Sequence, residues 1–281
     1  MARTIGIAHP GEMGAAVGAT LVAEGHTVLW SSEGRSGDTV ARARDAGLTD
    51  VGSMAVLAQR AEIVLSVCPP HAALDVARQL SGFAGLYLDA NAIAPSTARS
   101  VRELVESGGA SYVDGGIVGS PPGGSERPRI YLSGERAEEV APLFGSSRVL
   151  VRVVSKSPTA ASAVKMSYAA WTKGTAALLL DIVALARAEG VEEELLGEWS
   201  ATSPELIARS WRAAQSATTK GWRWVGEMEE IAASFRSDGL PGGFHEAAAE
   251  IYRRSPRDNA APATAECLDA VLGALGGQAE R

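Results

Sequence analysis

Short runs of apolar and β-branched residues alternate with helical patterns through the first half of the chain. The first run covers residues 4–8, a helical pattern follows at 13–24, and a second run covers 27–30. Further runs of the same kind lie at 63–67, 85–88, 111–113, 129–132 and 149–154. Such alternation is typical of βαβ units that build a parallel sheet.

The strand pattern stops after Val154, and only helical composition follows. Ser157-Pro158 is suited to begin a helix, and roughly 30 residues of helical composition run to Gly190 with one interruption at Gly174. Further helices are predicted to start at Ser203-Pro204-Glu205 and to cover 225–235, 244–253 and 262–275. We therefore expect an α/β domain over 1–155 and an all-helical domain over 156–281 that begins with a long linking helix.

Composition narrows the class of protein. The 281 residues are 46% hydrophobic, enough for two cores, and 26 Lys+Arg against 33 Asp+Glu give a net charge of -7, which disfavours nucleic acid as a partner. Cys68 and Cys267 have no paired spacing, so we expect no disulfide, no metal site and a cytoplasmic protein. No uncharged apolar run approaches the ~18 residues of a membrane helix, and Pro10 and Glu12 break any signal-peptide core, so we expect no membrane partner and no processing.

A glycine-containing turn, Gly6 to Gly14, lies between the first strand and the first helix. Backbone N–H groups at such a helix start would face a pyrophosphate, with Gly11 allowing close approach and Gly14 close helix packing. His9 stands where the first glycine of the fingerprint is usual, and a stiff turn is the alternative interpretation of His9-Pro10. Because the flanking strands and helix also fit, we predict that a dinucleotide contacts the turn residues His9, Pro10, Gly11, Glu12, Met13 and Gly14.

The residues after the second strand predict which dinucleotide is bound. Ser31, Ser32 and Arg35 suit the 2′-phosphate of NADP, because a guanidinium can grip a phosphate with two hydrogen bonds. Glu33 favours NAD unless it points to solvent. We expect NADP(H) in preference to NAD(H).

Five features, spread over nearly the whole chain, resemble the β-hydroxyacid dehydrogenase superfamily. This superfamily includes the 6-phosphogluconate and 3-hydroxyisobutyrate dehydrogenases, with the imine reductases beside them. The features are Pro10-Gly11-Glu12-Met13-Gly14, Pro69-Pro70, Asp89 to Pro95, Val113 to Pro121, and Lys165. The chain is most similar to a 6-phosphogluconate-dehydrogenase-like subgroup whose C-terminal domain has no assigned function.

The resemblance implies a Rossmann-like domain, an all-helical second domain and hydride transfer between nicotinamide and a carbonyl or alcohol. It makes Lys165 the general acid/base, because a lysine in a partly desolvated cleft can donate a proton to the oxygen as hydride reaches carbon. A solvated lysine on a helix face is the alternative. The resemblance also places Cys68, Pro69, Pro70 and Asn91 at the cofactor.

Three departures alter the expected substrate site, for which the resemblance indicates Asn91, Gly116, Val118, Gly119 and Ser120. Asn91 and Val118 replace serines of the family, and Tyr168 replaces the asparagine that follows the catalytic lysine. An unmodified 3-hydroxy-acid pocket is therefore not expected.

The segment from Asp114 to Pro122 is more similar to an imine reductase, although those enzymes usually carry Asp or Tyr in place of Lys165. Tyr168 lies one helical turn after Lys165 and is a candidate second proton donor, with a packed tyrosine as the alternative.

The helical half holds five of the six tryptophans, which we expect in the core or at a subunit interface. Among them, Trp224 is a candidate wall of the substrate pocket. His245 follows a glycine-rich loop and is a candidate at the mouth of the cleft, with a surface histidine as the alternative. We expect Glu227, Glu229 and Glu230 on a solvated helix face, although one of them could hold a substrate amine.

Three hypotheses follow for the function. The first is an NADP(H)-dependent oxidoreductase acting on a carbonyl or alcohol of a small to medium substrate, the second is an imine reductase, and the third is a non-catalytic nucleotide sensor. Relatives usually dimerise through the helical domain, and a helical domain of this size buries little alone, so we expect a homodimer.

Overall fold

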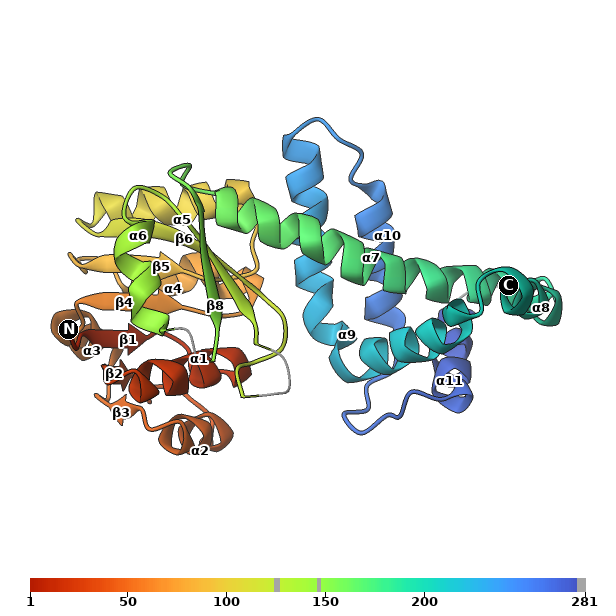
Figure 1. Ribbon diagram of the computed structural model, residues 1–281, viewed down its shortest axis with the longest axis horizontal. Helices are drawn as coiled ribbons and strands as arrows, with labels where there is room; N and C mark the ends of the chain where they lie inside the picture. The colour runs from red at the N-terminus through yellow and green to blue at the C-terminus, as the bar shows by residue number, and fades with distance from the viewer. Residues whose placement is uncertain (124–126, 146–147, 277–281) are drawn as a thin grey trace. The chain divides into compact units, whose positions relative to one another are not determined.

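The computed structural model describes residues 1–123, 127–145 and 148–276. The chain divides into two compact units, residues 1–166 and the part from residue 167 onward. The first is an α/β sandwich and the second is helical (Figure 1). This confirms the predicted fold class of a Rossmann-like domain followed by helices.

The first unit is built on one eight-stranded sheet in the order β3-β2-β1-β4-β5-β6-β7-β8. Strands β1 to β6 are parallel, β7 runs antiparallel to β6, and β8 is parallel to β7. The strands are β1 (Thr4–Ile7), β2 (Thr27–Trp30), β3 (Thr49–Asp50), β4 (Ile63–Ser66), β5 (Leu86–Asp89), β6 (Ser111–Val118), β7 (Arg129–Ser133) and β8 (Leu150–Ser155). The order reverses between β1 and β4, and ligands of such sheets bind at the carboxyl ends of the strands beside that reversal.

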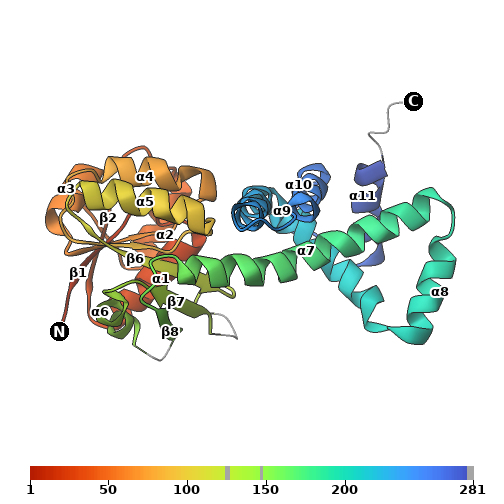
Figure 2. The ribbon, with the colours of Figure 1, turned by 90° about the horizontal axis from the view of Figure 1, so that it is seen from above.

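Helices cover both faces of this sheet (Figure 2). One face packs against α1 (Glu12–Ala23), α2 (Gly37–Asp45), α6 (Ala137–Val140) and the 3-10 turn η2 (Ala141–Phe144). The other packs against α3 (Met54–Arg60), α4 (Ala73–Gln79) and α5 (Pro95–Ser107), with the 3-10 turn η1 (Pro70–Ala72) before α4. In β5, the side chains of Leu86 and Leu88 point into the core on one face of the sheet, and that of Tyr87 points into the core on the other face. Successive side chains of a strand alternate between the two faces, and here both faces are buried.

Strand β3 is absent from the sequence prediction. It contains only Thr49 and Asp50, both exposed, and it pairs with the end of β2. With no apolar run, such a strand leaves no periodic signal.

The second unit is formed by the main part of α7 (Ala160–Ala188), with α8 (Glu192–Thr202), α9 (Glu205–Ser237), α10 (Gly243–Arg254) and α11 (Ala265–Gly276). The long helix predicted up to Gly190 is α7, which continues through Gly174, whereas the predicted separate helix at 225–235 is wrong because α9 is continuous. Glycine serves packing in both helices. A Cβ on Gly174 would lie 3.3 Å from Phe244, and one on Gly221 would lie 3.3 Å from Tyr252.

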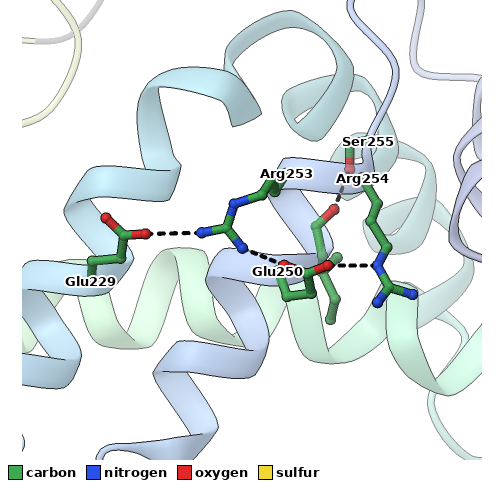
Figure 3. Close-up of polar contacts among 6 residues, drawn as sticks. Glu229, Glu250, Arg253, Arg254 and Ser255 are labelled. Atoms are coloured by element: carbon green, nitrogen blue, oxygen red, sulfur yellow. Dashed lines mark hydrogen bonds and ion pairs between the residues drawn. The ribbon is translucent and has the colours of Figure 1, made fainter.

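Apolar packing joins α9 and α10. Met228, Ile231 and Ala232 of α9 are buried, as are Ile251 and Tyr252 of α10. An exposed ion-pair network runs along the same helices: Arg253 binds Glu229 of α9 and Glu250, and Arg254 binds Glu250 (Figure 3). Exposed pairs contribute about 0–1 kcal/mol each, so the buried apolar residues stabilise this helix pair most.

By length and composition, α7 is the one described helix that could cross a membrane. The core helix of a water-soluble protein passes the same test. Of the window of α7 that passes this test, 39% is buried inside the protein.

Candidate active site

The turn between β1 and α1 is shaped by glycine. Gly11 is the N-cap residue of α1, adopts an extended conformation and has no side chain that could cap the helix start. A Cβ on Gly14 would collide with the carbonyl oxygen of His9, so only glycine allows the helix to begin this close to the strand. The uncapped first turn, with the positive end of the helix dipole, suits an anionic group.

His9 is held in this turn by Arg35. Arg35 Nη1 lies 2.6 Å from His9 Nδ1, and Nη2 donates to the carbonyl oxygen of Ala8 at 3.1 Å. Burial, then the charges of Arg35 and Arg42, lower the pKa of His9. The structure thus brings Arg35 from the loop after β2 onto the first residue of the predicted phosphate-binding turn.

Asp50 of β3, an acidic residue that the sequence prediction missed, lies beside the end of β2. Ser31 is buried and donates its hydroxyl to the Gly52 carbonyl, whereas the Ser32 N–H donates to Asp50 Oδ1 at 3.1 Å. The Ser32 hydroxyl, which also bonds to Asp50, lowers the pKa of that carboxyl. Asp50 pairs in register with Trp30, although it lies twenty positions further along the chain.

Asn91 connects the ends of β4 and β5. It is 1% exposed; Oδ1 accepts from the Cys68 N–H at 2.6 Å and Nδ2 donates to Ser66 Oγ at 3.0 Å. Its amide therefore holds the Cys68-Pro69-Pro70 loop in place. Burial and the nearby Asp89 raise the pKa of the Cys68 thiol to about 12, so the thiol is not a nucleophile near neutral pH.

The buried carboxylate of Asp114, in β6, anchors the start of α7. It accepts hydrogen bonds from Ser162 N at 2.8 Å, from Ser162 Oγ at 2.5 Å and from Ser133 Oγ at 3.0 Å. Ser133 Oγ in turn accepts from the Ala161 N–H at 2.9 Å. Two strands therefore satisfy N–H groups of the first turn of α7, the role that the sequence prediction gave to Ser157.

Lys165 follows this anchor by one helical turn and is half-buried. A Cβ on Gly116 would lie 2.7 Å from the Ala161 carbonyl oxygen and 3.0 Å from Lys165 Cβ. The missing side chain at Gly116 thus allows α7 to pack directly on β6. Gly116 therefore lies directly against Lys165.

The other predicted site residues have different surroundings. Val118 is buried in β6, and Gly119 and Ser120 are exposed after it. Tyr168, three residues after Lys165 on α7, is 48% exposed.

In the second unit, Trp224 belongs to a charged cluster. Lys173 forms an ion pair with Glu227, and its Nζ lies 5.2 Å from the centre of the Trp224 ring. The Tyr252 hydroxyl donates to the Lys173 carbonyl oxygen at 2.6 Å. The expectation that Glu227 is solvated is wrong, because its side chain is only 16% exposed and faces a lysine.

His245 is buried, at 6% exposure, so the surface alternative is wrong. Its ring packs between Phe235 and Phe244, with centroids 4.4 and 5.3 Å away. Its Nδ1 has no hydrogen-bond partner in the described part of the protein, and burial lowers its pKa. Over the same residues, no group of three or more His, Cys, Asp or Glu side chains could hold a metal ion.

Comparisons with known proteins identify the family of the first domain. The NAD binding domain of 6-phosphogluconate dehydrogenase matches residues 4–151, and a domain of unknown function, DUF1932, matches residues 186–255. An uncharacterized 28.5 kDa protein of Methanothermus fervidus is 29% identical over 167 residues, which are 58% of this chain and 63% of that protein. This chain therefore spans less than two thirds of the curated relative it matches.

Solved structures share the fold over both units. A conserved protein of unknown function, similar in structure to 3-hydroxyacid dehydrogenases, is 29% identical, with a TM-score of 0.66 over 90% of this chain and 97% of that one. A 3-hydroxyisobutyrate dehydrogenase of Mycobacterium tuberculosis, solved with L-serine, is 18% identical, with a TM-score of 0.72 over 98% of this chain and 100% of that one.

More distant structures contain either dinucleotide. A reductive aminase of Aspergillus terreus with NADPH is 18% identical, with a TM-score of 0.56 over 96% of this chain and 99% of that one. An imine reductase variant of Myxococcus stipitatus with NAD+ is 19% identical, with a TM-score of 0.56 over 97% of this chain and 98% of that one. At these identities the likeness establishes the fold alone.

The buried carboxyls predict a pH dependence of stability. Burial raises the pKa of Asp114 to about 6 and that of Asp89 to about 7, above the ordinary 3.8. The folded protein therefore keeps protons that the unfolded chain has released, and the free energy of unfolding is expected to fall as pH rises from about 4 to about 7. Asp114→Asn cannot ionise and should remove roughly 3 kcal/mol of that fall, measured by urea unfolding at several pH values. Asp45→Asn, at an exposed position, is the control; an unchanged slope in Asp114→Asn would contradict the assignment.

Proposed function

The chain belongs to the family of proteins with the NAD binding domain of 6-phosphogluconate dehydrogenase, and from this premise we propose that it is an NADP(H)-dependent oxidoreductase. The proposed reaction transfers hydride between the nicotinamide and a carbonyl or secondary alcohol of a small to medium substrate. The observation that carries the proposal is the placement of Lys165, one turn after the buried anchor of α7 and directly against Gly116 of β6.

The turn between β1 and α1 fits a dinucleotide. The uncapped start of α1 would face the pyrophosphate, and the buried Arg35 Nε–H, which lacks a partner among the described residues, marks a donor that an anionic ligand could satisfy. Gly11 to Gly14 and the Cys68-Pro69-Pro70 loop would line the cofactor. When bound, the nicotinamide would supply or accept the hydride.

Lys165 would supply the proton chemistry. In reduction, its ammonium donates a proton to the substrate oxygen as hydride reaches carbon, and the neutral amine takes that proton back in oxidation. The anchor at Asp114 and Ser133 keeps the helix backbone fixed while the lysine side chain carries the proton.

Imine reduction is the second candidate, favoured by the surroundings of Asn91 and Val118. The two serines that the family resemblance places at the substrate are replaced here by an amide engaged in internal hydrogen bonds and by a buried valine. Neither residue offers a hydroxyl for a substrate carboxylate. Cofactor oxidation by a cyclic imine, but not by 3-keto acids, would favour this candidate, whereas cofactor binding without turnover on either class would favour a nucleotide sensor.

A substitution at Lys165 tests the acid/base role. Lys165→Met is expected to lower kcat/KM by about 100-fold or more on any substrate that wild type turns over, while the Kd for NADPH stays within about twofold. Lys156→Met, which removes an exposed lysine with an 82% accessible side chain, is the matched control. Normal cofactor binding with unchanged turnover in Lys165→Met would exclude the role.

We propose a modest preference for NADP(H), because two charges near the end of β2 act in opposite directions. Arg35 uses two of its five N–H donors on His9 and Ala8, so donors remain for a 2′-phosphate. The ionised Asp50 beside Ser32 repels the same phosphate.

Removing the Asp50 charge is expected to increase the preference. Asp50→Asn keeps an oxygen acceptor for Ser32 and Gly52 and should raise the ratio Kd(NADH)/Kd(NADPH) about fivefold, measured by fluorescence titration at low salt. Glu33→Gln, at the exposed neighbouring position, controls for general charge. A lower ratio in Asp50→Asn would mean that Asp50 does not face the phosphate.

We further propose a cytoplasmic homodimer formed through the helical unit. Trp171, Leu178, Ile182 and Leu185 of α7 are 63%, 39%, 36% and 64% exposed and are spaced 7, 4 and 3 residues apart, which places them on one helix face. Ile182 and Leu185 also line an apolar cleft with Val191 and Leu195. A second copy of the chain, related by a twofold axis, would cover this apolar face with the same face of its own α7.

Light scattering tests the dimer. Wild type is expected at twice the 29.1 kDa chain mass, and Leu185→Glu should shift the protein toward monomer because it places a charge in the apolar face. Val40→Glu substitutes another exposed apolar side chain, on α2, and should leave the mass unchanged. A monomeric wild type would overturn the proposal.

A further inference from the structure

His9 is the least expected residue of the phosphate-binding turn. The dinucleotide fingerprint places a glycine there to allow a tight turn, whereas this chain has an imidazole. The structure shows how that imidazole is held and which of its nitrogens carries the proton.

The hydrogen bond from Arg35 fixes the tautomer of His9. A guanidinium has only donors, so at 2.6 Å from Arg35 Nη1 the Nδ1 atom must be the acceptor. Burial and the charges of Arg35 and Arg42 lower the pKa of His9, which keeps the ring neutral near pH 7. The single proton of the neutral ring is therefore on Nε2.

The Nε2 atom lies at the start of α1. A Cβ built on Gly11 would lie 3.4 Å from His9 Nε2 and 3.3 Å from Cδ2, so this edge of the ring adjoins the residue that precedes the helix. The Nε2–H donor thus adjoins the first-turn N–H groups, where an anion would bind.

We propose that His9 donates a hydrogen bond from Nε2 to the pyrophosphate of the dinucleotide, and that Arg35 is the positioning residue that makes it a donor. This inference rests on the dinucleotide binding proposed above and assigns a contact that the usual glycine cannot make. The Arg35 charge on Nδ1 also draws electron density from the ring, which strengthens the Nε2–H donor toward a phosphate oxygen.

A pyrophosphate contact of His9 and Arg35 can be distinguished from recognition of the 2′-phosphate by comparing the two dinucleotides. The pyrophosphate is common to NADH and NADPH, so loss of the His9 contact should weaken both ligands by the same factor. A residue that acts on the 2′-phosphate alone should weaken only NADPH. Substitution of Arg35 is expected to weaken NADH and NADPH by a common factor, because His9 is no longer positioned, and to weaken NADPH by a further factor, because the 2′-phosphate loses a contact.

The experiment is fluorescence titration of NADH and NADPH against wild type and five variants. His9→Ala should raise both Kd values about tenfold, and His9→Gln, whose amide can replace the donor, should recover part of that loss. Arg35→Met should raise the Kd for NADH about as much as His9→Ala does. The double variant should bind NADH no more weakly than either single variant, because the two residues act as one unit. Arg42→Met removes a nearby charge and should change neither Kd more than twofold.

Each other outcome has a definite meaning. If wild type binds neither dinucleotide, the proposed function fails; if wild type binds and His9→Ala binds equally well, only this inference fails. A loss confined to NADPH in Arg35→Met, or additive losses in the double variant, would overturn the coupling. Thermal unfolding measured by circular dichroism verifies that each variant is folded, and His9→Gln provides the test if His9→Ala is not.

Discussion

The hydrogen bonds between Asp114, Ser133 and the first turn of α7 are the constraint on which the candidate active site depends. A carboxylate in β6 accepts the N–H group at 162 and a hydroxyl in β7 accepts the one at 161, so side chains of the sheet cap these two positions of the helix start. The cost of burying a carboxyl is offset because three donors surround it. Lys165 takes its position from this cap, since the helix can neither slide nor rotate without breaking it.

At the carboxyl ends of the strands, some polar side chains already have hydrogen-bond partners within the protein and others have donors left over. Ser31 and Asn91 are buried, and their side chains form hydrogen bonds with neighbouring loops of the protein. His9 and Arg35 are different, because their mutual bond leaves donors on both side chains available. Counting the donors and acceptors already used within the protein separates the two groups.

The sequence predicted the layers of the first unit well, because its buried strands are short apolar runs and many of the turns between elements contain glycine. It also indicated the dinucleotide turn and Lys165 by pattern and by resemblance. Contacts between residues far apart in the chain could not be predicted from the sequence. Asp50 contacts Ser32 only because β2 and β3 pair, and Asp114 bonds to Ser162 of α7, 48 positions along the chain. The helix break predicted before residue 225 is wrong because Gly221 makes room there for Tyr252, and a propensity rule cannot distinguish such a glycine from a helix end.

The contact of α7 with Gly116 also limits how this site could change in evolution. Lys165 sits where it does because one methyl group is missing from β6, and even alanine would press on the Ala161 carbonyl. Ser120 and Tyr168 are exposed, so substitutions at these positions leave the contact of α7 with β6 unchanged. Position 116, by contrast, is closed to neutral drift: a side chain there would displace the lysine before it altered any substrate contact.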